Sequence, residues 1–238
     1  MSETSKIVMG HNQWGKAEVR LVRITRDTAR HEIHDLNITS RLHGELDAAH
    51  VDGDNSNMTP TDTQKNTIFA LAKDGIGSPE EFLLRLGRHF VSKEPIHGGR
   101  WEAEQYSWSR IEVDGAGHDH SFVRSGTETR TAAVTISDDG ETFVIAGLKN
   151  LVILKSSGSQ FTGFPVDSYT TLAEATERIL ATSVTAGWRY NTAELDFDSA
   201  FDGVRLCRWM IDTPRASNPN TTARAAPPAP NTTALPAP

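Results

Sequence analysis

The stretch MTPTDTQKNTIFALAK, residues 58–73, places hydroxyl, carboxylate and amide side chains at the start of an expected helix. Its apolar residues recur at helical spacing, which predicts a helix over about residues 62–73. Thr61 and Gln64 match the T-x-x-Q capping box, in which two side chains satisfy the free amide groups of the first helical turn. Free amides beside the hydroxyl of Thr61 and the carboxylate of Asp62 also form a surface that can bind an anion. The pattern therefore leaves two roles open for this helix start, capping and anion binding.

The sequence GHDHSF is another place where side chains could do chemistry, because His118 and His120 flank Asp119. Alternate residues of a strand share a face, so the two imidazoles could approach one ion. Two histidines alone leave a metal under-coordinated, however. We therefore interpret the segment as a structural or surface loop and expect no metal site.

Composition and charge limit the classes of protein to consider. The chain has 238 residues, of which 37% are hydrophobic and 23% are charged, as in an ordinary soluble globular protein. A net charge of −7 and a pI near 5.7 argue against a nucleic-acid surface. No apolar run reaches the length of a membrane span, and the first residues lack a signal-peptide core. The single cysteine, Cys207, excludes an intramolecular disulfide and suits a reducing cytoplasm. We therefore expect a cytoplasmic protein with neither nucleic acid nor a membrane as partner.

The first half of the chain predicts four strands and two helices. Alternation of apolar and polar residues predicts strands over residues 16–25, 31–46, 100–113 and 121–137. A second helix should begin at Ser78, with Pro79 at its first position and Glu81 closing a capping box. The order of elements is then β-β-α-α-β-β.

After residue 137 the same order begins again but does not finish. Residues 141–156 and 186–191 are expected as strands. Thr171 and Glu174 repeat the capping-box spacing, which predicts a helix between these two strands. One more helix is expected from Phe197. The sequence therefore predicts an α+β fold of two repeated antiparallel units, the second of them incomplete.

From about Cys207 the chain is rich in Pro, Ala, Asn and Thr and has almost no large apolar side chain. Such a composition cannot bury enough surface to offset its ordering entropy, so we expect this tail to be disordered. The expected organisation is a flexible N-terminus, a first domain, a partial second domain and a disordered Pro/Ala-rich tail, at residues 1–13, 14–137, 138–212 and 213–238.

Four motifs follow one another along the chain: WGKAEVRLVRITRDTARHEIHDLNI, PTDTQKNTIFALAK, GIGSPEEFLLRLGRHF and LVILKSSGSQFTGFPVDSYTTLAEATERILATSVTAGWRY. Together they closely resemble urate oxidase (uricase) of the actinobacterial type, from about Trp14 to Phe201. The resemblance implies a tandem of two tunnelling-fold (T-fold) domains, with four subunits stacking their sheets into a barrel around a tunnel. It also implies oxidation of urate by O2 and water to 5-hydroxyisourate and hydrogen peroxide in purine degradation, with no metal or organic cofactor.

The resemblance assigns roles to five side chains. Lys16 in WGKAEV and Thr61 match a catalytic Lys–Thr relay, in which a lysine kept from water accepts a proton through a neighbouring hydroxyl. Thr61 and Asp62 match contacts to urate. Phe161 in SQFTGF matches the ring that stacks on the purine, and Arg178 in ATERIL matches the guanidinium that grips it. In the family the Lys–Thr pair comes from one subunit and the Phe–Arg pair from its neighbour. We therefore expect each pair to be close in space and the two pairs to be far apart within one chain.

The sequence departs from the family where a Gln, an Asn and a relay His should complete the site. No histidine follows His120 and no glutamine follows Gln160. The Pro/Ala-rich tail stands in place of that segment, as a truncation or a frameshift would produce. Two hypotheses follow: a urate oxidase, or a catalytically dead relative that only binds urate or co-assembles with an intact subunit. A pterin- or GTP-handling T-fold enzyme is a third possibility, but such enzymes usually need a metal-ligating Cys/His set that Cys207 alone cannot provide.

Overall fold

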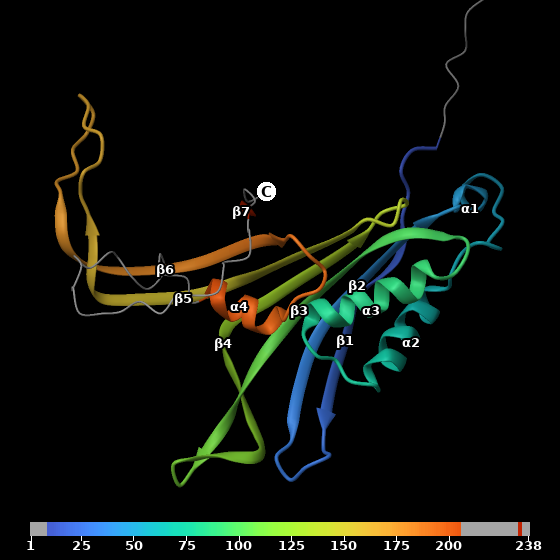
Figure 1. Ribbon diagram of the computed structural model, residues 1–238, viewed down its shortest axis with the longest axis horizontal. Helices are drawn as coiled ribbons and strands as arrows, with labels where there is room; N and C mark the ends of the chain where they lie inside the picture. Colours follow the sequence, from blue (N-terminus) through green and yellow to red (C-terminus); the bar gives the residue numbers. More distant parts are fainter. Residues whose placement is uncertain (1–8, 206–232, 235–238) are drawn as a thin grey trace, which may run out of the picture.

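The computed structural model describes residues 9–205 and 233–234, and its centre is one continuous antiparallel sheet (Figure 1). The strands lie side by side in chain order, so each pairs with the next one along the sequence. They are β1 (Trp14–Thr25), β2 (Glu32–Gly44), β3 (Ile96–Val113), β4 (Ala116–Ile136), β5 (Thr142–Phe161), β6 (Ala175–Tyr190) and the short β7 (Thr233–Ala234). The helices are α1 (Asp47–Val51), α2 (Thr61–Ala72), α3 (Pro79–Val91) and α4 (Phe197–Arg205).

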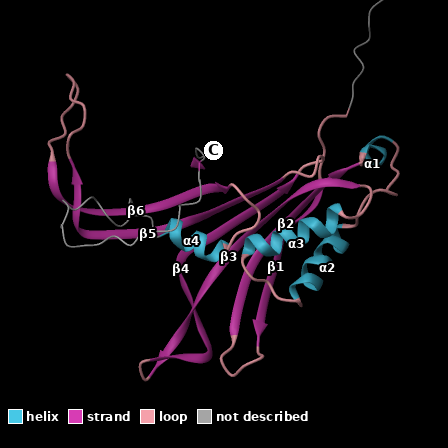
Figure 2. Cartoon of the chain, viewed as in Figure 1, coloured by secondary structure: helices cyan, strands magenta, loops and turns pink. Residues whose placement is uncertain are grey.

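The first unit consists of β1 to β4 with α2 and α3 on one face (Figure 2). On β2, Leu36, Ile38 and Leu42 are almost fully buried, because alternate residues of a strand point to the same face and this face is covered by helices. The predicted four-stranded antiparallel sheet with two helices on one face is confirmed. The short helix α1 is an element that the sequence pattern does not predict.

The starts of α2 and α3 differ in how they are capped. At α3 the Ser78 hydroxyl accepts from the Glu81 N–H, and the Glu81 carboxylate accepts from the Ser78 N–H at 2.9 Å, so the predicted capping box is confirmed. At α2 the predicted box is wrong. Pro60 is the residue before the helix, Thr61 is the first helical residue, and no side chain caps this end. The Gln64 side chain is fully buried and faces the sheet instead.

The largest difference from the sequence prediction lies between β5 and β6. No helix begins at Thr171, and from Ala175 the chain forms β6, which pairs with β5. The Glu174 carboxylate accepts from the Gly163 N–H at 2.8 Å and so closes the β5–β6 connection rather than capping a helix. Backbone pairing with β5 thus overrides the local helical spacing of the apolar residues. Arg178 consequently lies on a strand, not on a helix.

The rest of the second unit agrees with the sequence pattern. The strand expected over residues 186–191 is the last part of β6, and the helix expected from Phe197 is α4. The ring centroids of Phe197 and Tyr190 are 5.3 Å apart, and those of Phe201 and Trp188 are 5.8 Å apart. These contacts place α4 against β6 and extend one apolar core across both units.

The same irregularity recurs in both units. Strand pairing shifts after Lys16 in β1 and after Leu148 in β5, so each strand contains a bulge. Each bulge holds a non-glycine residue at positive φ, Glu18 at 54° and Asn150 at 58°. A repeated bulge of this kind indicates two copies of one structural unit. Lys16 and Leu148 therefore occupy equivalent positions.

A buried ion cluster joins the two units. Arg130 of β4 donates to the Glu80 carboxylate of α3 at 2.7 Å and to Asp198 of α4 at 2.6 Å. Its guanidinium also lies 4.3 Å from the centre of the Phe201 ring. Arg130 therefore holds α3 and α4 on the same face of the sheet.

The expectation of a tail without regular structure is wrong for Thr233 and Ala234, which pair with the end of β6. The other residues after Arg205, including Cys207, and residues 1–8 lie outside the described part of the chain. The domain boundaries stay predictions. Among the described residues, no helix is long and apolar enough to cross a membrane.

Candidate functional site

Lys16 lies near the start of β1, directly opposite Ser40 of β2. Opposed residues of an antiparallel pair share a face of the sheet, and Ser40 belongs to the fully buried, helix-facing row of β2. The Ser40 hydroxyl donates to the amide oxygen of Gln64 at 2.8 Å. Gln64 lies in the first turn of α2, which begins at Thr61. One buried hydrogen bond thus joins the strand pair that carries Lys16 to the helix that begins with Thr61.

Further contacts fix α2 against β1 at both ends. The Trp14 indole N–H donates to the Thr59 carbonyl at 2.8 Å, just before the helix begins. Arg23 donates to the last carbonyls of α2, at 2.6 Å in the case of Lys73. A cation at a helix C-terminus is favourable because the unpaired carbonyls there carry partial negative charge. The start of α2 is therefore held in a fixed place relative to the start of β1.

Asp62 is an exposed carboxylate at the start of α2, and its ionisation is coupled to two lysines. The Lys65 ammonium lies 2.5 Å from its carboxylate. This hydrogen bond is the main reason that the pKa of Asp62 lies below its ordinary value of 3.8, and the charge of Lys16 lowers it further. The positive charge of Lys16 is therefore close enough to the start of α2 to stabilise the ionised form of Asp62.

Phe161 and Arg178 lie together on β5 and β6. Phe161 is the last residue of β5, and Arg178 pairs with Ser159 across the two strands. The guanidinium carbon of Arg178 is 5.8 Å from the centre of the Phe161 ring, and Phe161 is 45% exposed. A partly open aromatic face beside a planar cation suits a flat anionic ligand.

Phe164 covers one side of Phe161. The two rings are nearly parallel, with centroids 4.9 Å apart and planes inclined by 13°. The chain turns between them at Gly163, whose φ of 70° lies in the left-handed region that glycine adopts without strain. On the opposite strand, Glu177 accepts from the Gly158 N–H at 2.7 Å. These contacts fix the end of the hairpin and the orientation of the Phe161 ring.

The two pairs of predicted site residues lie far apart within the chain. Lys16 lies on β1 and Arg178 on β6, and the strand order places β2, β3, β4 and β5 between them. Figure 1 shows the distal part of the β5–β6 hairpin projecting away from β1 and α2. Within residues 9–205 the two pairs therefore do not meet.

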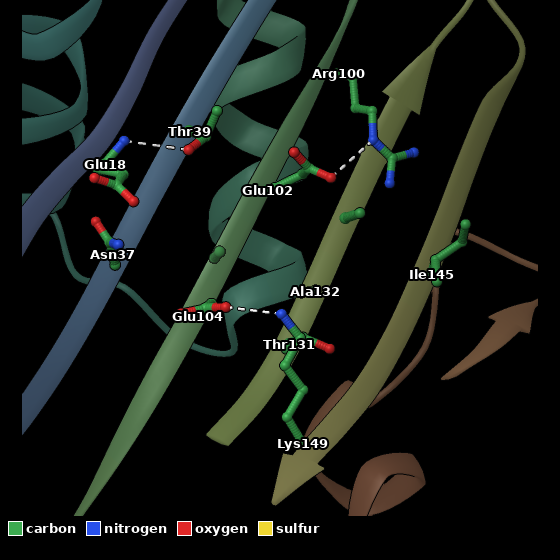
Figure 3. Close-up of a pocket in the computed structure, with 12 residues that line it drawn as sticks. Glu18, Asn37, Thr39, Arg100, Glu102, Glu104, Thr131, Ala132, Ile145 and Lys149 are labelled. Carbon is green, nitrogen blue, oxygen red and sulfur yellow. Dashed lines mark hydrogen bonds and ion pairs between the residues drawn. The ribbon is translucent and has the colours of Figure 1, made fainter. Parts of the chain in front are cut away.

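A pocket of about 350 Å³ lies on the helix-free face of the sheet (Figure 3). Its two cations pair with glutamates of the same pocket. Lys149 donates to Glu104 at 2.9 Å, and Arg100 donates to Glu102 at 3.0 Å. None of the five predicted site residues lines it. Because its cations are already neutralised, this pocket offers little attraction to an anion.

The GHDHSF segment lies within β4, so its prediction as a loop is wrong. The rings of His118 and His120 are 4.4 Å apart, and Asp119 pairs with Arg30 at 3.1 Å. In the described part of the chain, no group of three or more His, Cys, Asp or Glu side chains is arranged to hold a metal ion.

Two residues of these clusters, Ser40 and Phe164, are not predicted from the sequence. Ser40 has a detectable signal, since it is a polar residue at a position of β2 where alternation requires an apolar one. Phe164 has none, because its contact with Phe161 depends on the turn at Gly163.

The continuous antiparallel sheet, its repeated bulge and the helices on one face define an α+β protein of two related units, the second incomplete. The crystal structure of a uricase from Arthrobacter globiformis has a TM-score of 0.74 at 56% identity, covering 84% of this chain and 69% of that chain. For a uricase from Bacillus fastidious the TM-score is 0.65 at 28% identity, covering 84% of this chain and 76% of that chain. The fold is therefore the tandem T-fold of these proteins.

Sequence comparisons identify the family. A sequence model of the uricase family matches residues 12–135 and 144–221. A uricase from Arthrobacter globiformis is 56% identical over 205 residues, covering 86% of this chain and 66% of the relative. A uricase from Schizosaccharomyces pombe is 38% identical over 216 residues, covering 86% of this chain and 72% of the relative. The chain belongs to the uricase family.

The extent of the match differs from the sequence-based expectation. The chain spans about two thirds of the length of the curated relatives it matches. The family match continues to residue 221, beyond Phe201, where the resemblance read from the four motifs ends.

Proposed function

We propose that this chain is a subunit of a urate oxidase, which converts urate, O2 and water to 5-hydroxyisourate and hydrogen peroxide. Membership of the uricase family supports the activity. The observation that supports the proposal most is that β1, with Lys16, and β6, with Arg178 beside Phe161, are separated by four strands of one sheet. Such separated pairs can meet only across an interface between subunits. We infer a homotetramer in which neighbouring chains share each site.

Lys16 and Thr61 form the half of the site that moves a proton. Lys16 takes the urate proton through the Thr61 hydroxyl, which is both donor and acceptor. The urate anion then supplies the two electrons that reduce O2 to peroxide, and water supplies the oxygen added to the purine. Atoms and electrons balance without a bound cofactor. The free amides at the start of α2 attract the anion, whereas the negative charge of Asp62 repels it. Asp62 therefore contributes its backbone N–H rather than its carboxylate.

Phe161 and Arg178 form the half of the site that holds the purine. Phe161 stacks on the ring system with the face that Phe164 leaves open. Arg178 donates two parallel hydrogen bonds to one edge of urate, which only a planar guanidinium can do. The setting that we propose is purine degradation in the cytoplasm.

The proposal is tested by turnover and binding measured separately. Purified protein in air-saturated buffer should remove the ultraviolet absorbance of urate and release one peroxide per urate. Equilibrium dialysis without oxygen measures urate binding alone. Binding without peroxide would identify the catalytically dead relative, and absence of both would refute the proposal.

Mixing two variants tests the shared site. Lys16→Ala and Arg178→Ala chains should each be inactive, and Arg178→Ala should also lose urate binding. Co-assembled at random, they should regain roughly a quarter of the wild-type activity, since some interfaces combine two intact halves. Arg189→Ala, which removes an arginine from the same strand β6 beside Phe143, is the matched control and should keep full activity. Mixtures that stay inactive while forming stable assemblies would contradict a site shared between subunits.

A further inference from the structure

We propose that Ser40 and Gln64 are positioning residues that set the distance between the Lys16 ammonium and the Thr61 hydroxyl. This inference rests on the proposed proton relay. Ser40 is directly opposite Lys16 in the β1–β2 pair, and Gln64 lies one helical turn after Thr61. The 2.8 Å bond between Ser40 and Gln64 is therefore a short link between the two halves of the relay.

The ladder between β1 and β2 cannot by itself fix Lys16. The pairing shifts immediately after this residue, and the Glu18 N–H donates to the Thr39 hydroxyl at 3.2 Å instead of continuing the regular backbone pattern. Glu18 also has a positive φ of 54°. The Trp14–Thr59 hydrogen bond holds the start of α2 near the start of β1, but a strand interrupted at this point also needs an attachment at the level of the lysine itself. The Ser40–Gln64 bond supplies that attachment.

Stability alone does not explain a serine and a glutamine at these positions. Both are 0% exposed, and the other residues of Ser40's buried row on β2, Leu36, Ile38 and Leu42, are apolar. Among the described residues, the Gln64 amide nitrogen has no hydrogen-bond partner, which is unfavourable for a buried donor. Replacing both partners by apolar groups of similar shape is often neutral or stabilising. Burying Ser40 and Gln64 therefore costs folding free energy, and a role in positioning Lys16 and Thr61 explains why a polar pair is found here.

The second unit provides an internal comparison. There the position of Lys16 is taken by Leu148, and the residue opposite Leu148 is Ala186. Ala186 thus replaces Ser40 in the unit that has a leucine, Leu148, at the position of Lys16. A serine hydroxyl is therefore present opposite Lys16 in the first unit and absent opposite Leu148 in the second.

The test is the double variant Ser40→Ala/Gln64→Leu, assayed for stability, binding and turnover. We expect a melting temperature equal to or above that of the wild type, since both polar partners are removed together. Urate affinity without oxygen should change less than about twofold, whereas kcat should fall about 10- to 100-fold, because small misplacements of reacting groups are costly. A double variant with wild-type kcat would overturn the proposal, and so would one whose kcat falls only in proportion to lost folded protein.

Ile38→Val is the matched control, because it trims the same buried layer of β2 without touching the hydrogen bond. It should lower the melting temperature and leave kcat unchanged. An equal fall in kcat for Ile38→Val would show that any disturbance of this layer has the same effect, which would refute a specific role of the pair.

A second readout does not depend on turnover and so separates this inference from the proposed activity. In a Lys65→Met background, Lys16 is the remaining lysine that lowers the pKa of Asp62. If the Ser40–Gln64 bond holds Lys16 near α2, introducing Ser40→Ala and Gln64→Leu in this background should raise the pKa of Asp62 towards its ordinary 3.8. NMR titration measures this pKa. An unchanged Asp62 titration would overturn the inference even if the wild-type chain oxidises urate, and a raised one would support it even if the chain does not.

Discussion

Replacing Arg130 by methionine should strongly destabilise the fold, because it leaves a buried carboxylate without its cation. Glu80 is 0% exposed, and its carboxylate accepts from Arg130 at 2.7 Å. Removing one partner of a buried ion pair costs about 3–5 kcal/mol. Total stabilities of about 5–15 kcal/mol make this a large part of the folding free energy. The loss should also free α4, since Arg130 holds Asp198 and the Phe201 ring as well.

The size of this loss should depend on pH. Burial raises the pKa of Glu80 above its ordinary 4.5 even with Arg130 in place, and it must rise further in Arg130→Met. An acid whose folded-state pKa is raised contributes its full stability below the unfolded pKa and loses it as the pH rises through the folded pKa. The destabilisation of Arg130→Met should therefore be small near pH 4.5 and should grow towards neutral pH.

Urea unfolding followed by circular dichroism, at pH values from 4.5 to neutral, measures this dependence. The double variant Glu80→Gln/Arg130→Met is the control. It removes both charges, leaves Asp198 free to be solvated at 65% side-chain exposure, and should recover most of the lost stability. The reasoning is refuted if Arg130→Met stays within about 1 kcal/mol of the wild type at neutral pH, or if the double variant is no more stable than the single one.

Three further predictions concern other parts of the molecule. Glu18→Gly should raise the free energy of unfolding by about 0.5–1 kcal/mol, because a φ of 54° strains any residue with a Cβ; a lower urea midpoint would contradict this. Phe164→Ala should weaken anaerobic urate binding by up to about tenfold, because Phe161 loses the stacked ring that orients it; dialysis showing an unchanged affinity would count against that role. Lys149→Met should raise the pKa of Glu104, which hydrogen bonds from Lys149 and then from Tyr106 hold below 4.5. The wild type should therefore be more stable than this variant above pH 4.5, by less than about 1 kcal/mol at this exposed pair, with the difference vanishing on acidification.

Patterns within one element were enough to predict most of the first unit. The buried row of β2 follows from the even spacing of Leu36, Ile38 and Leu42. The start of α3 follows from Pro79 at its first position and from Ser78 and Glu81, which cap each other locally. The same spacing at Thr61 and Gln64 failed. There the Gln64 amide bonds to Ser40, a residue of another element, and no local rule reveals this competing partner.

The error at β6 has a related cause. Leu172 and Ile179 suggest the apolar side of a helix, but both are exposed, at 54% and 72%, on a hairpin held by strand pairing. Arg178 is close to Phe161 as the family resemblance led us to expect, although the secondary structure around it was predicted wrongly. Strand pairing with β5, which is not visible in the local pattern, makes this segment a strand. The contact between Phe161 and Arg178 was predicted from the family resemblance and not from the local pattern.

The bulge that recurs after Lys16 and Leu148 relates the two halves of the described chain as copies of one structural unit. The first copy has a lysine at this position, and the second has a leucine that is 0% exposed. The position is therefore polar in the first unit and part of the hydrophobic core in the second. With a lysine at one of the two equivalent positions, the proton relay that we propose occurs once in each chain.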